Sequence, residues 1–518
     1  MILLLLIIDA VWGGPFPLVT TPNGVIQGTH SRSYKGLDYS QFIGVPYAQP
    51  PVGNLRFKDP GTCIEMIQHN PHPEGGNLIG QEDCLYLNIF VPRTNPQSKD
   101  QLDVIVHVHG GAFNFGYGNN YAGPKLLMDI DVILVTMNYR LGPLGFLSTE
   151  DEVVPGNLGM KDQVESLKWI QSNIEYFGGN PKSVTLTGLS AGGASVHYHY
   201  LSPLSEGLFH RGISISGSAL CPWSFQEGAL EKTRQVGGAV GCFQNSTAEL
   251  IECLRQRPAE QIVNSVRMFR PWLYNPFSPF GVVKETEGSK PFLNEHPYEI
   301  LLNGKATNLP WLVSVTSEEG LYPAADYLLK DNYLIDLENR WLELAASVLD
   351  YNYTLPLVEH ASVAKLVKEL IILSGRKTSP RKLSKNWCSD RRPRHFYNTE
   401  EISTFSVYYT KSEARNGVCH GDDVMFIMSK PLEEMQKMTA RDESIKDVML
   451  KIWESFIKTG IPKVNDAKWV PLSKSVNADL DYLHIKSPEH VQMEINKGMG
   501  HPTFWNAIPF KENEKLLS

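Results

Sequence analysis

Short apolar runs recur along the chain and predict buried strands. Each run is rich in Val, Ile and Leu and is bounded by Gly, Asn or Pro. Runs that are apolar on both faces suit the middle of a sheet that is covered by helices. They lie at residues 85–91, 102–110, 131–139, 182–188, 211–218 and 309–317.

Helical patterns lie between and after these runs. Residues 158–174 place their apolar side chains near one stripe, and Gly178 and Gly179 follow as a stop signal. Residues 338–351 and 443–460 are also helical in pattern. The order strand, helix, strand predicts an α/β architecture, with a mostly parallel sheet flanked by helices.

The composition is that of a globular protein, with 518 residues of which 42% are hydrophobic and 20% are charged. This length allows one large domain or two ordinary ones, and no repeat or flexible linker divides it. The formal net charge is −8, and acidic and basic residues are interspersed. That distribution argues against a nucleic-acid partner, which would need a basic face.

The N-terminus begins with a short apolar run. It is too short to span a bilayer, so we interpret residues 1–13 as a signal peptide and residues 14–518 as a single secreted domain without stable membrane insertion. No Lys or Arg precedes the run and an acidic residue interrupts it, so a truncated or mispredicted first exon is the alternative. Glycosylation sequons at Asn245 and Asn352 agree with secretion.

None of the seven cysteines forms a C-x-x-C pair, which argues against a zinc ribbon or a thioredoxin-type redox site. Cys63 and Cys84 enclose a short loop, and so do Cys242 and Cys253. Local disulfides of secreted proteins have this spacing.

The segment GLSAG at residues 188–192 lies between a strand pattern and a helical pattern. Gly188 and Gly192 stand at the two positions where a tight strand-to-helix turn has no room for a Cβ. Such a turn presents the Ser190 hydroxyl at the carboxyl end of the sheet and directs amides of the helix N-terminus to the same place. We therefore interpret Ser190 as a nucleophile rather than as an ordinary loop serine.

A second strand runs into His109-Gly110-Gly111-Ala112, upstream of the serine. Small residues at a strand end let backbone N–H groups approach a substrate oxygen, so this segment fits the other half of an oxyanion hole. A plain strand-end turn is the alternative. His107 and His109 alternate on the strand without an acidic third ligand nearby in the sequence, and we predict no metal site.

A serine nucleophile needs a base, and the base needs an orienting acid. Of the 15 histidines, His420 differs from the others because it lies beside a glycine on a probable loop late in the chain. Glu318 and Glu319 follow a predicted strand and precede Gly320. The order serine, acid, histidine is that of the α/β hydrolases, and the residues alone leave the choice between the two glutamates open.

Together these motifs resemble the type-B carboxylesterase and cholinesterase family, and within it the insect venom-type and general carboxylesterases. The resemblance covers nearly the whole chain and is most specific at FGGNPKSVTLTGLSAG around Ser190 and at EDCLYLNIFVP from Glu82 to Pro92. GNLGMKDQ, NYRLGPLGF, TSEEGLYPAADY and GVCHGDD are further shared blocks. It implies an α/β-hydrolase fold and a serine carboxylesterase that hydrolyses small-molecule esters through an acyl-enzyme, without cofactor or metal.

Carried over position by position, the resemblance implies roles for individual residues. Ser190 would be the nucleophile, His420 the base, and Glu319, which directly precedes the glycine, the acid. Gly111, Ala112 and Ala191 would donate the oxyanion-hole amides. The structural pairs would be the disulfides Cys63–Cys84 and Cys242–Cys253, the ion pairs Arg56–Glu82 and Arg140–Asp162, and the buried Ser216 and Asp423 behind the histidine.

Departures from the family pattern narrow the substrate. No Trp or Tyr lies between Cys63 and Cys84 to bind a quaternary ammonium group, so a choline ester is disfavoured. Leu189 precedes the serine where juvenile hormone esterases typically carry Gln, which favours a general carboxylesterase. A juvenile-hormone-type esterase, a lipase, and a non-catalytic adhesion or sequestering member of the fold are the alternatives. The segments near residue 60 and at 391–410 also look shorter than in relatives.

Overall fold

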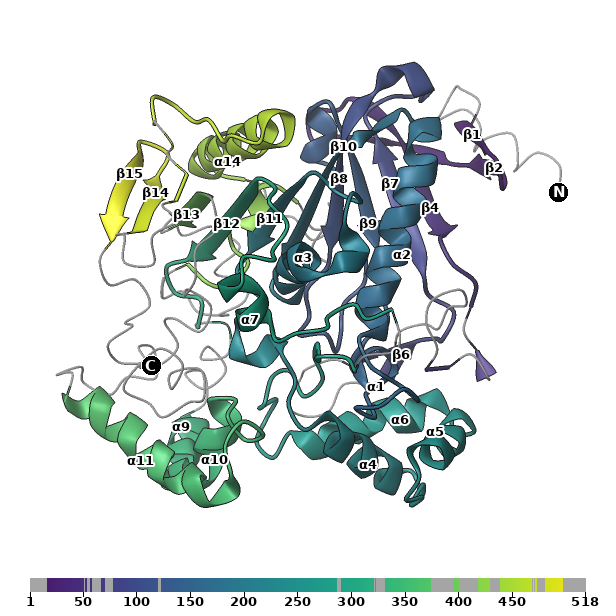
Figure 1. Ribbon diagram of the computed structural model, residues 1–518. Coiled ribbons are helices and arrows are strands. Elements are labelled where there is room, and N and C mark those ends of the chain that lie inside the picture. Colours follow the sequence, from purple (N-terminus) through teal and green to yellow (C-terminus); the bar gives the residue numbers. More distant parts are fainter. Residues whose placement is uncertain are drawn as a thin grey trace, which may run out of the picture.

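A twisted sheet runs through the protein, and helices pack on both of its faces, as the computed structural model shows (Figure 1). This arrangement confirms the α/β architecture predicted from the sequence. The described residues are 16–50, 52–53, 56–57, 67–69, 78–119, 123–286, 290–320, 322, 331–373, 395–399, 418–428, 438–467, 469, 471–472 and 480–496.

The strand order in this sheet is β15-β14-β13-β12-β11-β10-β8-β9-β7-β4-β3. Every neighbouring pair from β9 to β14 is parallel, whereas β3, β4, β7 and β15 pair antiparallel at the two ends. The strands are β3 (Thr29–Arg32), β4 (Asp38–Pro46), β7 (Tyr86–Val91), β8 (Leu102–Val108), β9 (Val132–Met137), β10 (Gly179–Leu189), β11 (Arg211–Ile215), β12 (Trp311–Thr316), β13 (His395–Thr399), β14 (Leu480–Ser487) and β15 (His490–Asn496).

All six predicted strand runs form strands of this sheet, from β7 to β12. Two small antiparallel pairs lie outside it, β1 (Leu18–Thr21) with β2 (Gly24–Gln27) and β5 (Ile67–His69) with β6 (Leu78–Gly80).

Strand β8 shows how the sheet divides the core. Val104 and Val106 belong to the apolar cluster that includes α2 (Leu158–Asn173) and α3 (Ala191–Leu201), whereas Ile105 belongs to the cluster that includes α14 (Ala440–Thr459). Alternate side chains of a strand point to opposite faces, so β8 is buried on both sides. The continuous apolar runs of the sequence have this cause.

Helix boundaries follow local signals. Helix α2 continues into a single 3-10 turn that ends at Gly178, whose φ of +85° confirms the predicted stop. Helix α14 begins three residues before the predicted start, because Thr439 and Asp442 form a reciprocal capping box. The predicted helix at 338–351 was wrong as one element: the chain breaks at Arg340, between α9 (Asp331–Asn339) and α10 (Trp341–Val348).

Helices α4 (Ala229–Ala239), α5 (Thr247–Arg255) and α6 (Ala259–Asn264) lie below the sheet on the right in the view of Figure 1, and α9, α10 and α11 (Leu357–Leu373) lie below it on the left. Helices α9 to α11 surround an apolar cluster of their own. None of the described helices is long and apolar enough to cross a membrane. Helix α1 spans Gly142–Phe146, and helix α7 spans Pro297–Leu302.

One predicted disulfide lies within the described residues, and it forms: the sulfur atoms of Cys242 and Cys253 are 2.01 Å apart. Cys63 lies outside the described residues, and so does the predicted Cys63–Cys84 bridge. Cys221 is also disulfide-bonded. No pattern in the sequence pointed to a bridge at Cys221.

Both predicted ion pairs are present. Arg140 Nη2 lies 2.6 Å from Asp162 Oδ1, and both side chains are almost fully buried. Arg56 Nη2 lies 2.7 Å from Glu82 Oε2. These charges are paired inside the scaffold and lie outside the site described below.

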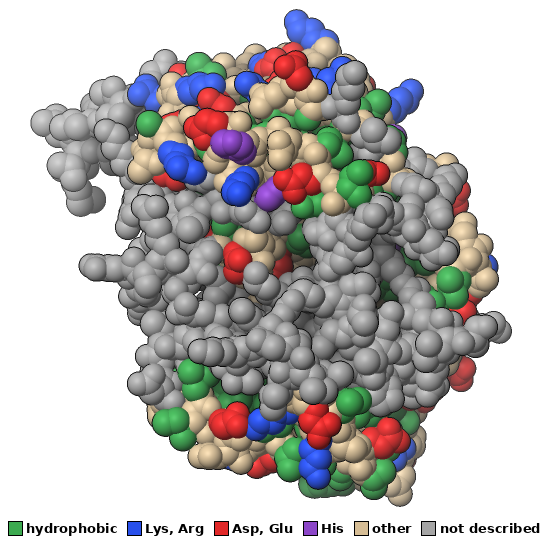
Figure 2. All heavy atoms as spheres, turned by 90° about the vertical axis from the view of Figure 1, so that its left-hand side faces the viewer, with side chains coloured by type: hydrophobic (Ala, Val, Ile, Leu, Met, Phe, Trp, Pro, Cys, Tyr) green, Lys and Arg blue, Asp and Glu red, His purple; other side chains and the backbone are tan. Residues whose placement is uncertain are grey.

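Figure 2 shows the face formed by the left-hand side of Figure 1. Lys, Arg, Asp and Glu side chains are interspersed on its described surface, as they are along the sequence. Residues 1–15, which include the predicted signal peptide, lie outside the described residues, as do residue 60 and, apart from 395–399, the segment 391–410.

Candidate active site

The turn that follows β10 holds Ser190 in an unusual backbone conformation. Its φ is +61° and its ψ is −122°, a region that residues with a side chain rarely adopt. The Ser190 amide donates to the Ile215 carbonyl over 2.8 Å, and the Ser190 carbonyl accepts from the Ala194 amide over 2.9 Å. These bonds tie the serine to β11 and to the first turn of α3.

Glycines make the turn possible because backbone crowds around it. A Cβ on Gly188 would lie 2.3 Å from the Gly192 carbonyl, and one on Gly192 would lie 2.0 Å from the Val108 carbonyl oxygen. A Cβ on Gly217 would lie 1.9 Å from the Ser190 carbonyl oxygen. The first two contacts explain the spacing seen in the sequence, while Gly217 carried no motif that pointed to it.

The segment after β8 lies against the same turn. The Cβ of Ser190 would be 3.0 Å from a Cβ placed on Gly110, so the two segments are in contact. Gly111 has a φ of +111°, and a Cβ there would lie 1.8 Å from the Phe115 carbonyl oxygen. Only glycine fits this position.

Three amides in this region have no acceptor among the described residues, namely those of Gly111, Ala112 and Ala191. Ala191 opens α3, where helix geometry leaves the first N–H groups free. The predicted oxyanion donors therefore lie on two adjoining segments beside Ser190, with their N–H groups available.

The second half of the site joins residues from two distant loops. His420 Nδ1 lies 2.5 Å from Glu319 Oε2, and the side chains are 18% and 15% exposed. Because a carboxylate can only accept, Nδ1 carries the proton and Nε2 keeps its lone pair. Glu319 Oε1 accepts from the Ser216 hydroxyl over 2.5 Å and from the Thr316 amide over 2.7 Å.

The Glu318 carboxylate binds the backbone of Val418 and not His420. Its Oε2 accepts from the Val418 amide over 3.1 Å, and its own amide donates to the Val418 carbonyl over 3.1 Å. Glu318 therefore holds the loop that carries His420, while Glu319 contacts the imidazole. The structure thus distinguishes two glutamates that the residues alone left equivalent.

Charges around His420 shift its proton affinity. Burial alone would lower the pKa of His420, but the charge of Glu319 and the hydrogen bond to it outweigh burial and raise that pKa. Burial would raise the pKa of Glu319, but His420 and the Ser216 hydroxyl lower it. The pair is thus arranged to stabilise an imidazolium beside a carboxylate.

Ser190 and His420 do not hydrogen-bond to each other, although both are described. Their neighbours are nevertheless in contact: a Cβ on Gly421 would meet the Leu189 side chain at 3.2 Å. Bonds between nucleophile and base are often long without substrate and shorten when it binds.

Ser216 and Asp423 both lie behind the His420–Glu319 pair, but each binds a different partner. Ser216 binds Glu319, whereas Asp423 accepts from the Ser314 hydroxyl over 3.1 Å. Burial, followed by the nearby Glu319 charge, raises the pKa of Asp423 to about 6.

Aromatic rings run from the Gly111 segment to the histidine. Ring centroids are 6.1 Å apart for Phe115 and Phe277, 5.7 Å for Phe277 and Tyr322, and 5.5 Å for Tyr322 and His420. This row links segments that are far apart in the chain, and no local pattern in the sequence pointed to it.

The other histidines considered from the sequence are buried and structural. Burial lowers the pKa of His107 to about 3 and that of His109 to about 4, so both are neutral. His109 Nδ1 lies 2.7 Å from the Gly110 carbonyl oxygen. Within the described part of the chain, no cluster of three His, Cys, Asp or Glu side chains could hold a metal ion.

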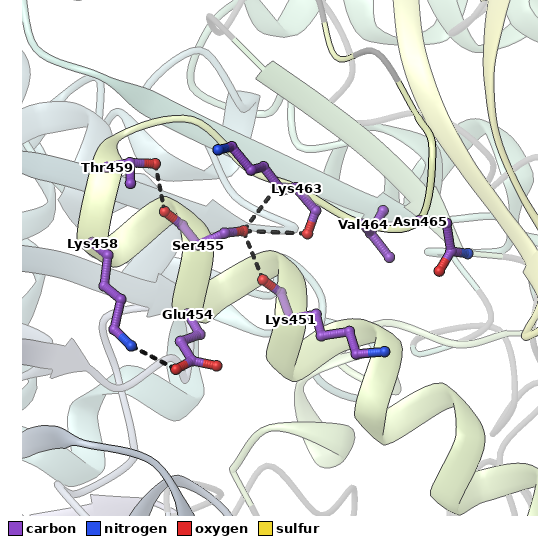
Figure 3. A pocket seen from close by; sticks show the side chains of 8 residues that line it. All are labelled: Lys451, Glu454, Ser455, Lys458, Thr459, Lys463, Val464 and Asn465. Carbon is purple, nitrogen blue, oxygen red and sulfur yellow. Dashed lines mark hydrogen bonds and ion pairs between the residues drawn. The ribbon is translucent and has the colours of Figure 1, made fainter.

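A surface hollow beside the C-terminal end of α14 lies apart from these residues (Figure 3). Some of its polar groups pair with one another: Lys458 pairs with Glu454 over 2.7 Å, and the Ser455 hydroxyl accepts from the Lys463 amide over 2.7 Å. The hollow contains none of the predicted site residues.

Comparisons with known proteins show the family to which the chain belongs. The profile of the carboxylesterase family matches residues 15–505. Venom carboxylesterase-6 of Apis mellifera is 40% identical, over 96% of this chain and 95% of that protein, and a carboxylic ester hydrolase of Bombus ignitus is 39% identical, over 96% and 95%. The crystal structure of juvenile hormone esterase from Manduca sexta, with OTFP covalently attached, matches with a TM-score of 0.79 at 25% identity, over 95% of this chain and 99% of that one.

Proposed function

The chain belongs to the carboxylesterase family and is an ester hydrolase with an α/β-hydrolase fold, and from this premise we propose that Ser190, His420 and Glu319 perform its acyl transfer. The observation that carries the assignment is the 2.5 Å pairing of His420 with Glu319, on loops that meet the Ser190 turn. The free amides of Gly111 and Ala112 support it.

The mechanism follows from these positions. His420 Nε2 accepts the Ser190 proton as Oγ attacks the ester carbonyl carbon, and Glu319 stabilises the imidazolium that forms. The amides of Gly111, Ala112 and Ala191 donate to the resulting oxyanion, each worth about 3–4 kcal/mol in the transition state. His420 then protonates the departing alcohol, and it next deprotonates the water that hydrolyses the acyl-enzyme.

The surroundings of the site favour an ester with an apolar group. The rings of Phe115, Phe277 and Tyr322 lie between the oxyanion segment and His420, and apolar substrate surface is stabilised by contact with such rings. Leu189 adds an apolar side chain beside Gly421. We favour a general carboxylesterase over the juvenile-hormone-type alternative on the identity of residue 189.

Labelling with a fluorophosphonate tests the assignment. We expect the folded protein to hydrolyse short-chain nitrophenyl esters and to carry the label on the peptide that contains Ser190. Ser190→Ala should lose both while keeping its fold, whereas Ser172→Ala, an exposed serine on α2, should keep both. A Ser190→Ala variant with wild-type turnover would overturn the proposal.

The same preparation separates the rival functions. Absence of label on the folded wild type would favour a non-catalytic binding member of the fold. Faster turnover of emulsified triglyceride than of soluble short-chain esters would favour a lipase.

Secretion, as a single domain spanning residues 14–518, is part of the same proposal. The Cys242–Cys253 disulfide supports it, because such bridges persist in oxidising compartments. Asn245 is exposed and Asn352 is partly exposed, so both sequons are accessible in some degree. Mass spectrometry of the protein from culture medium would test cleavage after the signal segment and glycan at each asparagine.

A further inference from the structure

Ser278 follows Ala112 by 166 residues in the chain, yet it contacts the backbone of the proposed oxyanion segment, residues 109–112. Ser278 donates its hydroxyl to the Ala112 carbonyl over 2.8 Å. The Asn114 side-chain amide donates to the same carbonyl. Both donors also lie within reach of the Phe280 carbonyl, at 3.1 Å from Ser278 and 3.4 Å from Asn114.

The segment needs such restraint, because its backbone is strained. Ala112 has a φ of +52° and Phe113 a φ of +56°, and the left-handed conformation is unfavourable for residues that carry a side chain. The Phe113 carbonyl accepts from the Gly142 amide over 2.7 Å, so it is held from another side. Ser278 and Asn114 hold the carbonyl between these two residues.

The number of available donor protons shows why the Ser278 hydroxyl is needed. Two carbonyl oxygens receive three protons, two from the Asn114 amide and one from the Ser278 hydroxyl. The two donor residues, Asn114 and Ser278, and the two acceptor residues, Ala112 and Phe280, are at most 7% exposed. Water therefore has little access to replace a lost donor. Ala112 is held at its carbonyl, while its N–H, on the other side of the same Cα, remains free for the substrate.

We infer that Ser278 is a positioning residue of the oxyanion hole, which fixes the left-handed conformation of Ala112 and thereby the direction of its N–H. The inference rests on the proposed function, since it assigns a role within the same acyl-transfer site. Ser278 does not touch the reacting atoms. Its effect passes through the Ala112 backbone.

Ser278→Ala tests this inference against a matched control. Ser265 has the same exposure of 7% and donates its hydroxyl to the Ile262 carbonyl over 2.6 Å, outside the proposed site. We expect kcat for a nitrophenyl ester to fall about tenfold in Ser278→Ala, less than the 10²–10³ that loss of an oxyanion donor costs, with KM nearly unchanged. Ser265→Ala should keep the wild-type kcat.

The affinity for a trifluoromethyl ketone distinguishes a positioning role of Ser278 from a purely structural one, which would leave this affinity unchanged. Its serine adduct carries an oxyanion, so its affinity should fall in Ser278→Ala by the same factor as kcat/KM. Ser278→Thr, which keeps the hydroxyl, should recover both values. If Ser278→Ala does not fold, Ser278→Cys, with a similar volume and a weak donor, provides the comparison with Ser278→Thr.

The outcomes separate this inference from the proposed function. If Ser278→Ala matches Ser265→Ala in kcat and in ketone affinity while the wild type is active and labelled at Ser190, the inference alone is overturned. If the folded wild type is neither active nor labelled, the proposed function fails first.

Discussion

His420 Nδ1 lies 2.5 Å from Glu319 Oε2, although 101 residues separate them in the chain. Glu319→Gln should lower kcat by about 10⁴, because a glutamine amide can donate and so favours the wrong imidazole tautomer. Glu318→Gln is the matched control, since it keeps an oxygen for the Val418 amide. Equal losses of ester turnover in the two variants would contradict the assignment of Glu319 as the acid.

The pH dependence of kcat/KM follows from the raised pKa of His420. The base must be neutral to accept a proton, so activity is lost as the pH falls through this pKa, above the value usual for imidazole. Asp423 is one of the charges that raise it, so Asp423→Asn should move the acid limb to lower pH. Asp447→Asn, exposed on α14, should leave the limb in place, and a matching shift there would refute the prediction.

Gly111→Ala should lower kcat by about 10²–10³, the cost of losing an oxyanion donor, because its Cβ would lie 1.8 Å from the Phe115 carbonyl oxygen. Gly24→Ala controls for backbone strain: its φ is +133°, and a Cβ there meets no atom within 4 Å. Steady-state kinetics on one ester compares the two. Unchanged kcat in Gly111→Ala would mean that this segment does not bind the oxyanion.

The double variant Cys242→Ser with Cys253→Ser should lower the free energy of unfolding by about 2–4 kcal/mol, because the bridge restricts the unfolded chain. Thermal unfolding under non-reducing conditions measures the change as a lower Tm. Ester turnover at low temperature should stay at the wild-type level, since the bridge lies outside the site. An unchanged Tm would show that the disulfide contributes nothing to stability.

The sequence predicted what local chemistry determines. The apolar runs gave the strands from β7 to β12, because strands buried on both faces leave an unmistakable pattern. Gly188 and Gly192 indicated the Ser190 turn, since their spacing reflects two close backbone contacts. The choice of Glu319 over Glu318 came from family resemblance and agrees with the hydrogen bonds.

What the sequence could not predict depends on contacts between distant segments. No sequence motif surrounds Ser278. Its hydrogen bond to Ala112 forms only because the fold brings together two residues that are 166 positions apart in the chain. The same holds for the ring row through Phe277 and for Gly217 against Ser190. The break at Arg340 was missed because helical periodicity continues across it.

The late position of His420 has a consequence for how the protein is made. Synthesis proceeds from the N-terminus, so the strands from β8 to β12, together with Ser190 and Glu319, emerge from the ribosome before His420 does. On the proposed mechanism, a nascent chain that has already formed its serine turn has no base. It therefore cannot hydrolyse esters in the cell that makes it before translation has passed His420, in the last fifth of the polypeptide.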